Sequence, residues 1–143
     1  MNICVWNNRK EVALAIVRIV VGVVFLLHGS QKLFGLFGGQ GLAGYVSWLA
    51  GIGVAPWLAY LSAAFEFAAG VSLVFGIAVE LGALMGLCVM IGAIYLVHGA
   101  HGYFIQNNGF EYALNLGLLC IAILVGGAGA CSIWDPFACE KSK

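Results

Sequence analysis

The chain places seven polar side chains within or at the ends of strongly hydrophobic segments. They are Arg18, His28, Gln31, Lys32, Glu66, His98 and Asn115. Polar and ionisable groups are expensive in hydrocarbon, so each is a functional hypothesis by default. A neutral histidine and a buried carboxylic acid can hydrogen-bond a quinone carbonyl and exchange the proton that accompanies its reduction. These residue types therefore predict a quinone-binding site inside a membrane.

The histidines allow two further interpretations. His28 and His98 each precede a glycine, so both could lie at helix C-termini, where the imidazole faces the negative end of the helix dipole. Two histidines facing each other across a helix bundle could also ligate haem iron axially. The pattern favours haem less, because neither histidine lies in mid-helix within a haem-sized ring of small residues.

The other polar residues also have structural explanations. Arg18 and Glu66 could form an ion pair that fixes the register of two helices. Asn115 could hydrogen-bond between helices, and Gln31 and Lys32 could extend towards the lipid headgroups. The sequence alone leaves these alternatives open beside the ligand-binding interpretation.

Composition identifies the elements that must position these residues. Of the 143 residues, 63% are hydrophobic and 8% are charged, and the mean hydropathy is +1.04. A spanning helix needs about 20 mostly apolar residues, and the segments that qualify are 12–34, 57–79, 81–98 and 111–130. We expect an all-α membrane protein, a single domain over 1–143 with a four-transmembrane-helix bundle. The glycine-rich segment between the first two helices is expected to include a short amphipathic helix at the interface.

An internal repeat suggests how the helices face one another. Residues 25–34 and 95–104 share the order aromatic, Leu, aliphatic, His, Gly, small and a final Phe. At about 1.5 Å per helical residue, both histidines lie roughly 24 Å from the inner ends of their helices. We therefore expect a polar layer drawn from all four helices, made of His28, Gln31, Glu66, His98 and Asn115, with Arg18 below it and fixing Glu66.

Basic residues and cysteines give an expected orientation. Arg9 and Lys10 precede the first helix and two lysines follow the last, so the positive-inside rule places both termini in the cytoplasm. Cys4, Cys131 and Cys139 would then be free thiols in a reducing compartment, whereas the reverse topology would allow a disulfide between the last two. A net charge of +0 with six basic residues disfavours a nucleic-acid partner.

The polar motifs resemble those of the DoxX family of small membrane proteins. They read Arg18-x9-His28-Gly29-x2-Lys32-Leu33-Phe34-Gly35, then Phe37-Gly38-Gly39, then Glu66-x3-Gly70-x5-Gly76. The resemblance implies a four-helix protein of a bacterial or archaeal inner membrane with a redox association. Relatives are described as a membrane subunit of thiosulfate:quinone oxidoreductase, a small subunit of a quinol oxidase, or an anchor for a sulfurtransferase and superoxide-dismutase assembly. Arg18, His28, Lys32 and Glu66 occupy the polar motif positions.

These observations together lead to one main functional hypothesis. We expect a redox-associated membrane subunit of a sulfur-compound:quinone oxidoreductase-like system, with quinone as its cofactor and no metal site. The alternative is a noncatalytic membrane anchor for a soluble sulfurtransferase or oxidative-stress enzyme. The lipid bilayer is the expected environment, and homo-oligomer formation and enzymatic activity of the chain itself are left open.

Overall fold

Four apolar helices and one short helix are the main elements of the computed structural model, which describes residues 9–134 and 136; short 3-10 turns at Leu36–Gly38, Gly99–His101 and Ile105–Asn107 lie in the connections. The apolar helices are α1 (Arg9–Phe34), α3 (Pro56–Phe75), α4 (Val79–Ala93) and α5 (Glu111–Gly126), and the short helix is α2 (Gly41–Gly51). In the described residues, α1, α3 and the helical stretch Val79–His101 are long and apolar enough to cross a membrane, and α5 is a shorter apolar helix. The expected all-α membrane bundle is confirmed.

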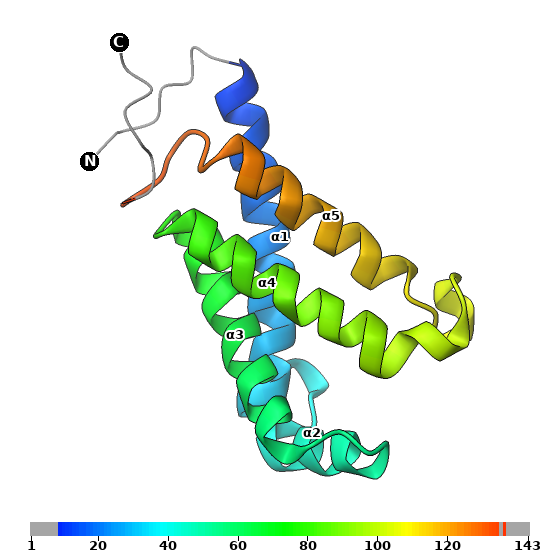
Figure 1. Cartoon of the computed structure of the whole chain (residues 1–143). Coiled ribbons are helices and arrows are strands. Elements are labelled where there is room, and N and C mark those ends of the chain that lie inside the picture. Colours follow the sequence, from blue (N-terminus) through cyan, green and yellow to red (C-terminus); the bar gives the residue numbers. More distant parts are fainter. Residues whose placement is uncertain (1–8, 135, 137–143) are drawn as a thin grey trace.

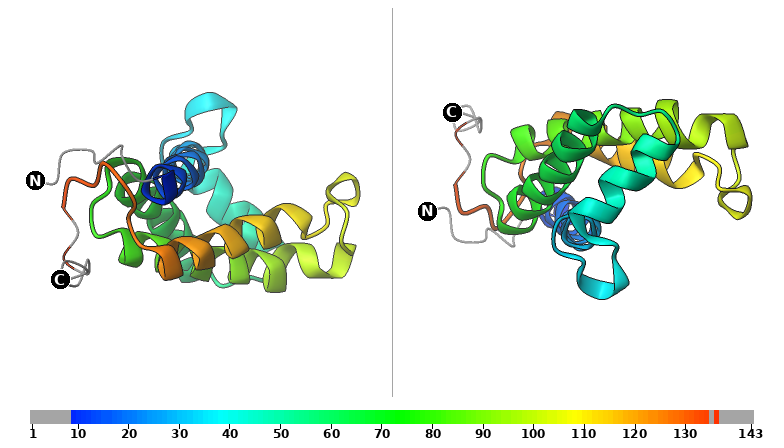
Figure 2. Two further views of the ribbon diagram at one scale, coloured as in Figure 1. Left: turned by 90° about the horizontal axis from the view of Figure 1, so that it is seen from above. Right: turned by 90° about the horizontal axis from the view of Figure 1, so that it is seen from below.

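The bundle consists of two helix pairs that cross obliquely. Figure 1 shows α1 beside α3, and α4 antiparallel to α5, with the far end of the second pair extending away from the first. The views along the bundle in Figure 2 show the same divergence. The start of α1 and the segment after α5 lie towards one end, and α2 lies across the other (Figure 1). This matches the expected short helix between the first two spans.

Glycines bring the α1 and α3 backbones into direct contact. A Cβ at Gly29 would lie 2.6 Å from Phe67 Cα, and one at Gly70 would lie 2.3 Å from Leu26 N. Real Cβ atoms do not approach other atoms so closely, so these positions need glycine; such small residues are typical of tight helix packing in membranes. The contact sets the register between the last turns of α1 and the middle of α3.

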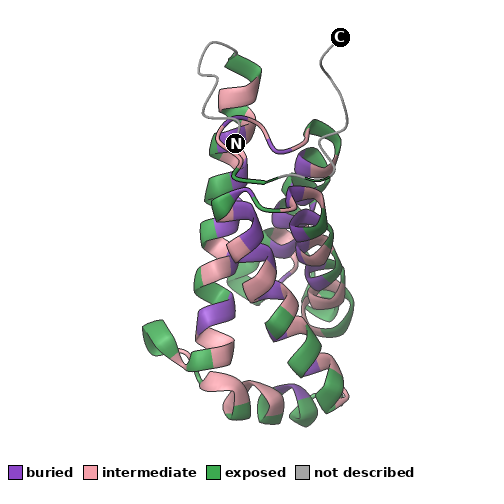
Figure 3. Cartoon of the chain, turned by 90° about the vertical axis from the view of Figure 1, so that its left-hand side faces the viewer, coloured by how far each residue is buried: buried purple, intermediate pink, exposed green. Residues whose placement is uncertain are grey.

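A continuous core occupies the region where the two helix pairs cross. Phe25 is fully buried there, and a Cβ at Gly86 would lie 2.7 Å from its ring. Buried residues of α1, α3, α4 and α5 form one hydrophobic cluster, and Figure 3 shows the buried positions mostly in the part of the bundle away from α2. Towards α2 the helices separate, because the second pair diverges.

Helix ends differ from the expected spans for identifiable reasons. α3 stops at Phe75 because Gly76 adopts a left-handed φ of 66°, so the expected span to residue 79 is too long. α5 stops at Gly126 because Gly127 has a φ of 82°. The expected span 81–98 remains helical but changes form, since Ile94–His98 make a π-helical turn. Such turns often occur at functional sites.

Arg18 closes the end of the bundle where α1 begins. Its side chain is fully buried and donates to Leu73 O at 3.0 Å, Ala130 O at 3.2 Å and Cys131 O at 3.2 Å. Backbone bonds between Trp134 and the turn after α3 hold the same segment in place. The expectation that Arg18 fixes Glu66 is therefore wrong. The Arg18 guanidinium instead binds carbonyl oxygens in the last turn of α3 and in the segment after α5.

The cysteines also differ from the expectation. Cys131 is disulfide-bonded, so the expectation that it is a free thiol is wrong. Cys88 is a free, exposed thiol and Cys120 a free, buried one, while Cys4 and Cys139 lie outside the described residues. The free-thiol expectation rested on the inferred cytoplasmic orientation of the termini, which stays a prediction.

Candidate ligand-binding site

A large cavity occupies the space where the helix pairs separate. It encloses about 540 Å³ and is lined by α1, α2, α3, α4 with its π-helical turn, and α5. This volume lies within the range of about 300–1,000 Å³ typical of small-molecule sites. Most of the lining is apolar; the polar side chains on it are His28, Lys32, Tyr45, Ser62, Glu66, His98, Asn108 and Tyr112.

The central polar contact of the cavity is an ion pair between α1 and α3. Lys32 Nζ donates to Glu66 Oε2, and the side chains are 24% and 5% exposed. The α1–α3 backbone contact places Lys32, near the end of α1, beside the middle of α3. Removing one partner of such a buried pair leaves an uncompensated charge, at a cost of about 3–5 kcal/mol.

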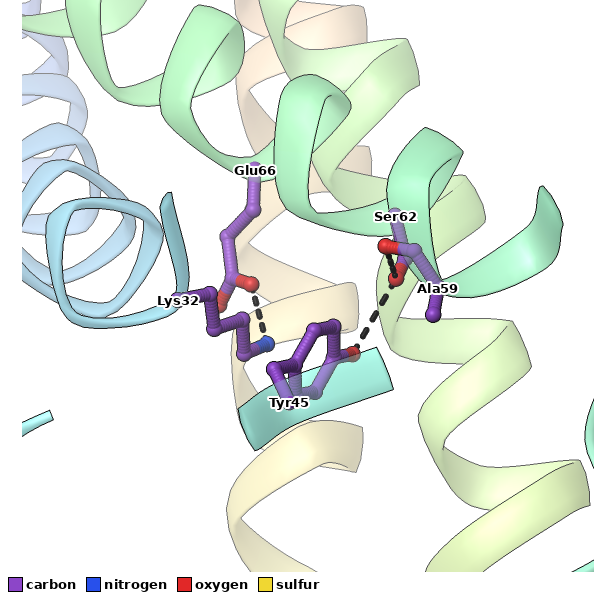
Figure 4. Close-up of polar contacts among 5 residues, drawn as sticks. All are labelled: Lys32, Tyr45, Ala59, Ser62 and Glu66. Atoms are coloured by element: carbon purple, nitrogen blue, oxygen red, sulfur yellow. Dashed lines mark hydrogen bonds and ion pairs between the residues drawn. The ribbon is translucent and has the colours of Figure 1, made fainter. Parts of the chain in front are cut away.

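Tyr45 of α2 contacts both Lys32 and Ser62. The Lys32 ammonium lies 4.9 Å from the centre of the Tyr45 ring, a distance typical of cation–π contacts. The Tyr45 hydroxyl lies 3.1 Å from Ser62 Oγ, and Ser62 donates to Ala59 O at 3.0 Å. Figure 4 shows these side chains together. The short helix α2 is therefore part of the site.

His28 and Tyr112 occupy another part of the cavity wall. Their ring centres lie 6.2 Å apart at a tilt of 55°, and both side chains line the cavity together with Glu66. Tyr112 is in the first turn of α5. An imidazole, a phenol, an ammonium and a carboxylate thus line one cavity from three helices, a combination that can donate and accept protons.

The π-helical turn presents His98 with a defined tautomer. His98 Nδ1 lies 2.8 Å from Asn108 O. Because a carbonyl oxygen can only accept, Nδ1 carries the hydrogen of this bond, and Nε2 is left for another partner. The two histidines of the similar segments 25–34 and 95–104, His28 and His98, both line the cavity.

The structure brings together four of the residues expected from sequence and separates the others. His28, Lys32, Glu66 and His98 line the cavity. Gln31 Nε2 instead donates to Phe37 O at 3.2 Å and lies outside the cavity. Asn115 lies on the exposed face of α5, and Arg18 lies at the opposite end of the bundle.

A second hollow adjoins the cavity on the side of the loop before α2. It encloses about 330 Å³ and is lined by Gln31, Lys32, Gly38, Gly39, Gln40, Tyr45 and Trp48. Lys32, Tyr45 and Trp48 line both spaces, so these side chains form the wall between them. Lys32 is accordingly accessible from both sides.

Sequence reasoning missed four polar cavity residues, which are Tyr45, Ser62, Asn108 and Tyr112. Ser62 precedes Glu66 by four positions, which is one helical turn, and that spacing could have identified it. No local signal in the sequence places Tyr45, Asn108 or Tyr112 at the cavity. Across residues 9–134 and 136, no group of three or more His, Cys, Asp or Glu side chains is arranged to hold a metal ion.

Comparison with known proteins gives one family and two full-length relatives. Residues 13–99 match the model of the DoxX family, a range that includes His28, Lys32, Glu66 and His98. A Bacillus subtilis (strain 168) protein named "Putative oxidoreductase CatD" is 30% identical over 137 residues, covering 96% of this chain and 95% of that protein. An uncharacterized protein of Haemophilus influenzae is 30% identical over 131 residues, covering 87% and 90%. No solved structure matches the chain.

Proposed function

Because this chain belongs to the DoxX family of small membrane proteins, we propose that its cavity binds the head group of a quinone. In this proposal the chain is the quinone-interacting membrane subunit of an oxidoreductase that draws electrons from a reduced sulfur compound. The observation that carries the proposal is a large apolar cavity with the Lys32–Glu66 pair on its wall. The name of the Bacillus subtilis relative agrees with a redox role.

The lining of the cavity suits both parts of a quinone. The apolar side chains accommodate the hydrophobic ring and tail, and the polar side chains can hydrogen-bond the carbonyl oxygens. The Lys32 ammonium is a donor that stabilises negative charge developing on such an oxygen. Glu66 holds that ammonium in place through the ion pair. A cavity wall that offered only hydrogen-bond acceptors would not stabilise this negative charge, and so would not favour reduction of the quinone ring.

The proposed reaction takes its electrons from an external reduced sulfur compound. Reduction of a quinone to its quinol takes up two electrons and two protons. Two thiosulfate ions supply the electrons when they couple through a new sulfur–sulfur bond as tetrathionate, on a soluble partner subunit. In this proposal the two protons come from solvent by way of the second hollow, which shares Lys32, Tyr45 and Trp48 with the cavity. Protonation of the carbonyl oxygens completes the quinol.

A tryptophan on the cavity wall supplies the assay. Trp48 lines the cavity, whereas Trp57 is 63% exposed and lies outside it. A short-chain quinone titrated into the protein in lipid nanodiscs is expected to give saturable quenching of tryptophan fluorescence. Trp48→Phe should remove most of that saturable component, and the matched control Trp57→Phe should retain it.

Substitutions of the ion pair test the role of the polar cluster. Lys32→Met should weaken quinone binding roughly 10- to 100-fold, because a charged hydrogen bond is lost; the exposed Arg9→Met control should leave it unchanged. Quenching that rises linearly with quinone and is equal in all variants would refute the proposal. If the chain is instead a noncatalytic anchor, a soluble enzyme co-purifies and its activity survives both Glu66→Gln and His28→Ala.

A further inference from the structure

One face of α5 lacks a partner within the chain and carries a polar side chain. The buried residues of this helix all lie on the opposite face; they are Ala113, Leu116, Gly117, Cys120 and Ile123. Asn115 is exposed on the free face. No group in residues 9–134 and 136 hydrogen-bonds its side-chain amide. This face would meet lipid in a single chain.

The exposed positions on this face follow the spacing of a two-stranded helix interface. Asn115, Leu118, Ala122 and Val125 are separated by three, four and three residues, which is the a/d pattern of a heptad repeat. Leu118 is 54% exposed and Val125 is 79% exposed. At about 100° per residue the four positions span less than one quarter of the helix circumference. The pattern therefore describes a narrow seam.

The amide group indicates what covers the seam. A side-chain amide facing hydrocarbon without a partner is costly, and an amide is self-complementary because it has both donors and an acceptor. Two copies related by a two-fold axis along the membrane normal can satisfy each other. A single Asn at an a position specifies the register of helix dimers, and Ala122 at the next a position allows close approach.

We propose that the chain forms a parallel homodimer through the seam of Asn115, Leu118, Ala122 and Val125 on α5. In this dimer Asn115 hydrogen-bonds the partner's Asn115 across the two-fold axis. The cavity of each copy is complete without the other, since α5 contributes Tyr112, Ala113 and Leu116 to it from elsewhere on the helix. The dimer is thus independent of the proposed quinone binding.

Dimerisation of the purified full chain in lipid vesicles tests this proposal. Copies that carry donor or acceptor fluorophores are mixed, and energy transfer is followed as the protein-to-lipid ratio falls. The wild-type chain should dimerise, and Asn115→Leu should raise the apparent dissociation constant about 3- to 30-fold through loss of interhelical hydrogen bonds. Asn115→Gln, which retains an amide, should recover part of the affinity.

Cross-linking locates the interface. In a chain carrying Cys88→Ser, which removes the exposed free thiol among the described residues, Leu118→Cys should give a disulfide-linked dimer on oxidation. Leu84→Cys is the matched control, because Leu84 is 48% exposed on α4; its oxidation should add no dimer. Circular dichroism confirms that each variant is folded. A monomeric wild-type chain, an Asn115→Leu variant that dimerises as well as wild type, or cross-linking at position 84 would overturn the proposal.

Discussion

The Lys32–Glu66 ion pair gives the most quantitative test of the site. Lys32→Met would leave Glu66, whose side chain is 5% exposed, as an unpaired carboxylate among apolar neighbours. Breaking a buried pair by removing one partner costs about 3–5 kcal/mol. The cation–π contact with Tyr45 is lost as well, adding about 0.5–1 kcal/mol. We therefore expect the free energy of unfolding to fall by about 3.5–6 kcal/mol.

A double variant separates the energy of the Lys32–Glu66 ion pair from the effect of losing each side chain. Lys32→Met combined with Glu66→Gln removes both charges, so most of the lost stability should return. The measurement is reversible unfolding by titration with a denaturing detergent in mixed micelles, followed by circular dichroism. Arg9→Met is the control and should change stability by less than about 0.5 kcal/mol. A loss below 1 kcal/mol for Lys32→Met, or strictly additive effects in the double variant, would show that the two groups are not coupled.

Three further outcomes follow from the packing and the covalent structure. Gly70→Ala should strongly destabilise or prevent folding, because its Cβ would lie 2.3 Å from Leu26 N, whereas Gly92→Ala, with nothing within 4 Å, should be tolerated; thermal melting compares the two. Arg18→Met should cost at least about 3 kcal/mol, because carbonyls at the ends of α3 and of the chain segment after α5 lose a buried charged donor; an unchanged melting temperature would contradict this. Maleimide should label Cys88 directly but Cys131 only after reduction; mass spectrometry locates the label, and direct labelling of Cys131 would contradict its disulfide.

The membrane architecture could be predicted from sequence because it rests on local composition. Each span is a run of apolar residues long enough to cross hydrocarbon, and a backbone in lipid must form its hydrogen bonds internally. The helix ends were less accurate. Gly76 and Gly127 end helices by adopting left-handed φ values, and an apolar run does not reveal which of its glycines will do so.

The candidate site could be predicted in part. The repeat correctly indicated that His28 and His98 belong to one region, since both line the cavity. Counting residues along straight helices also assigned Asn115 to that region. The structure places Asn115 on the outer face of α5, because depth along a helix says nothing about which way a side chain faces.

The sequence by itself determined that this chain is a helical membrane protein and that its motifs belong to one family. Tertiary structure alone decided which charges pair. Either Lys32 or Arg18 could have paired with Glu66. Lys32 does so because Gly29 and Gly70 set the α1–α3 register. Arg18 instead binds backbone carbonyl oxygens. The cavity likewise exists because α4 and α5 diverge from α1 and α3. Pair geometry arises from contacts between distant segments, which local sequence does not encode.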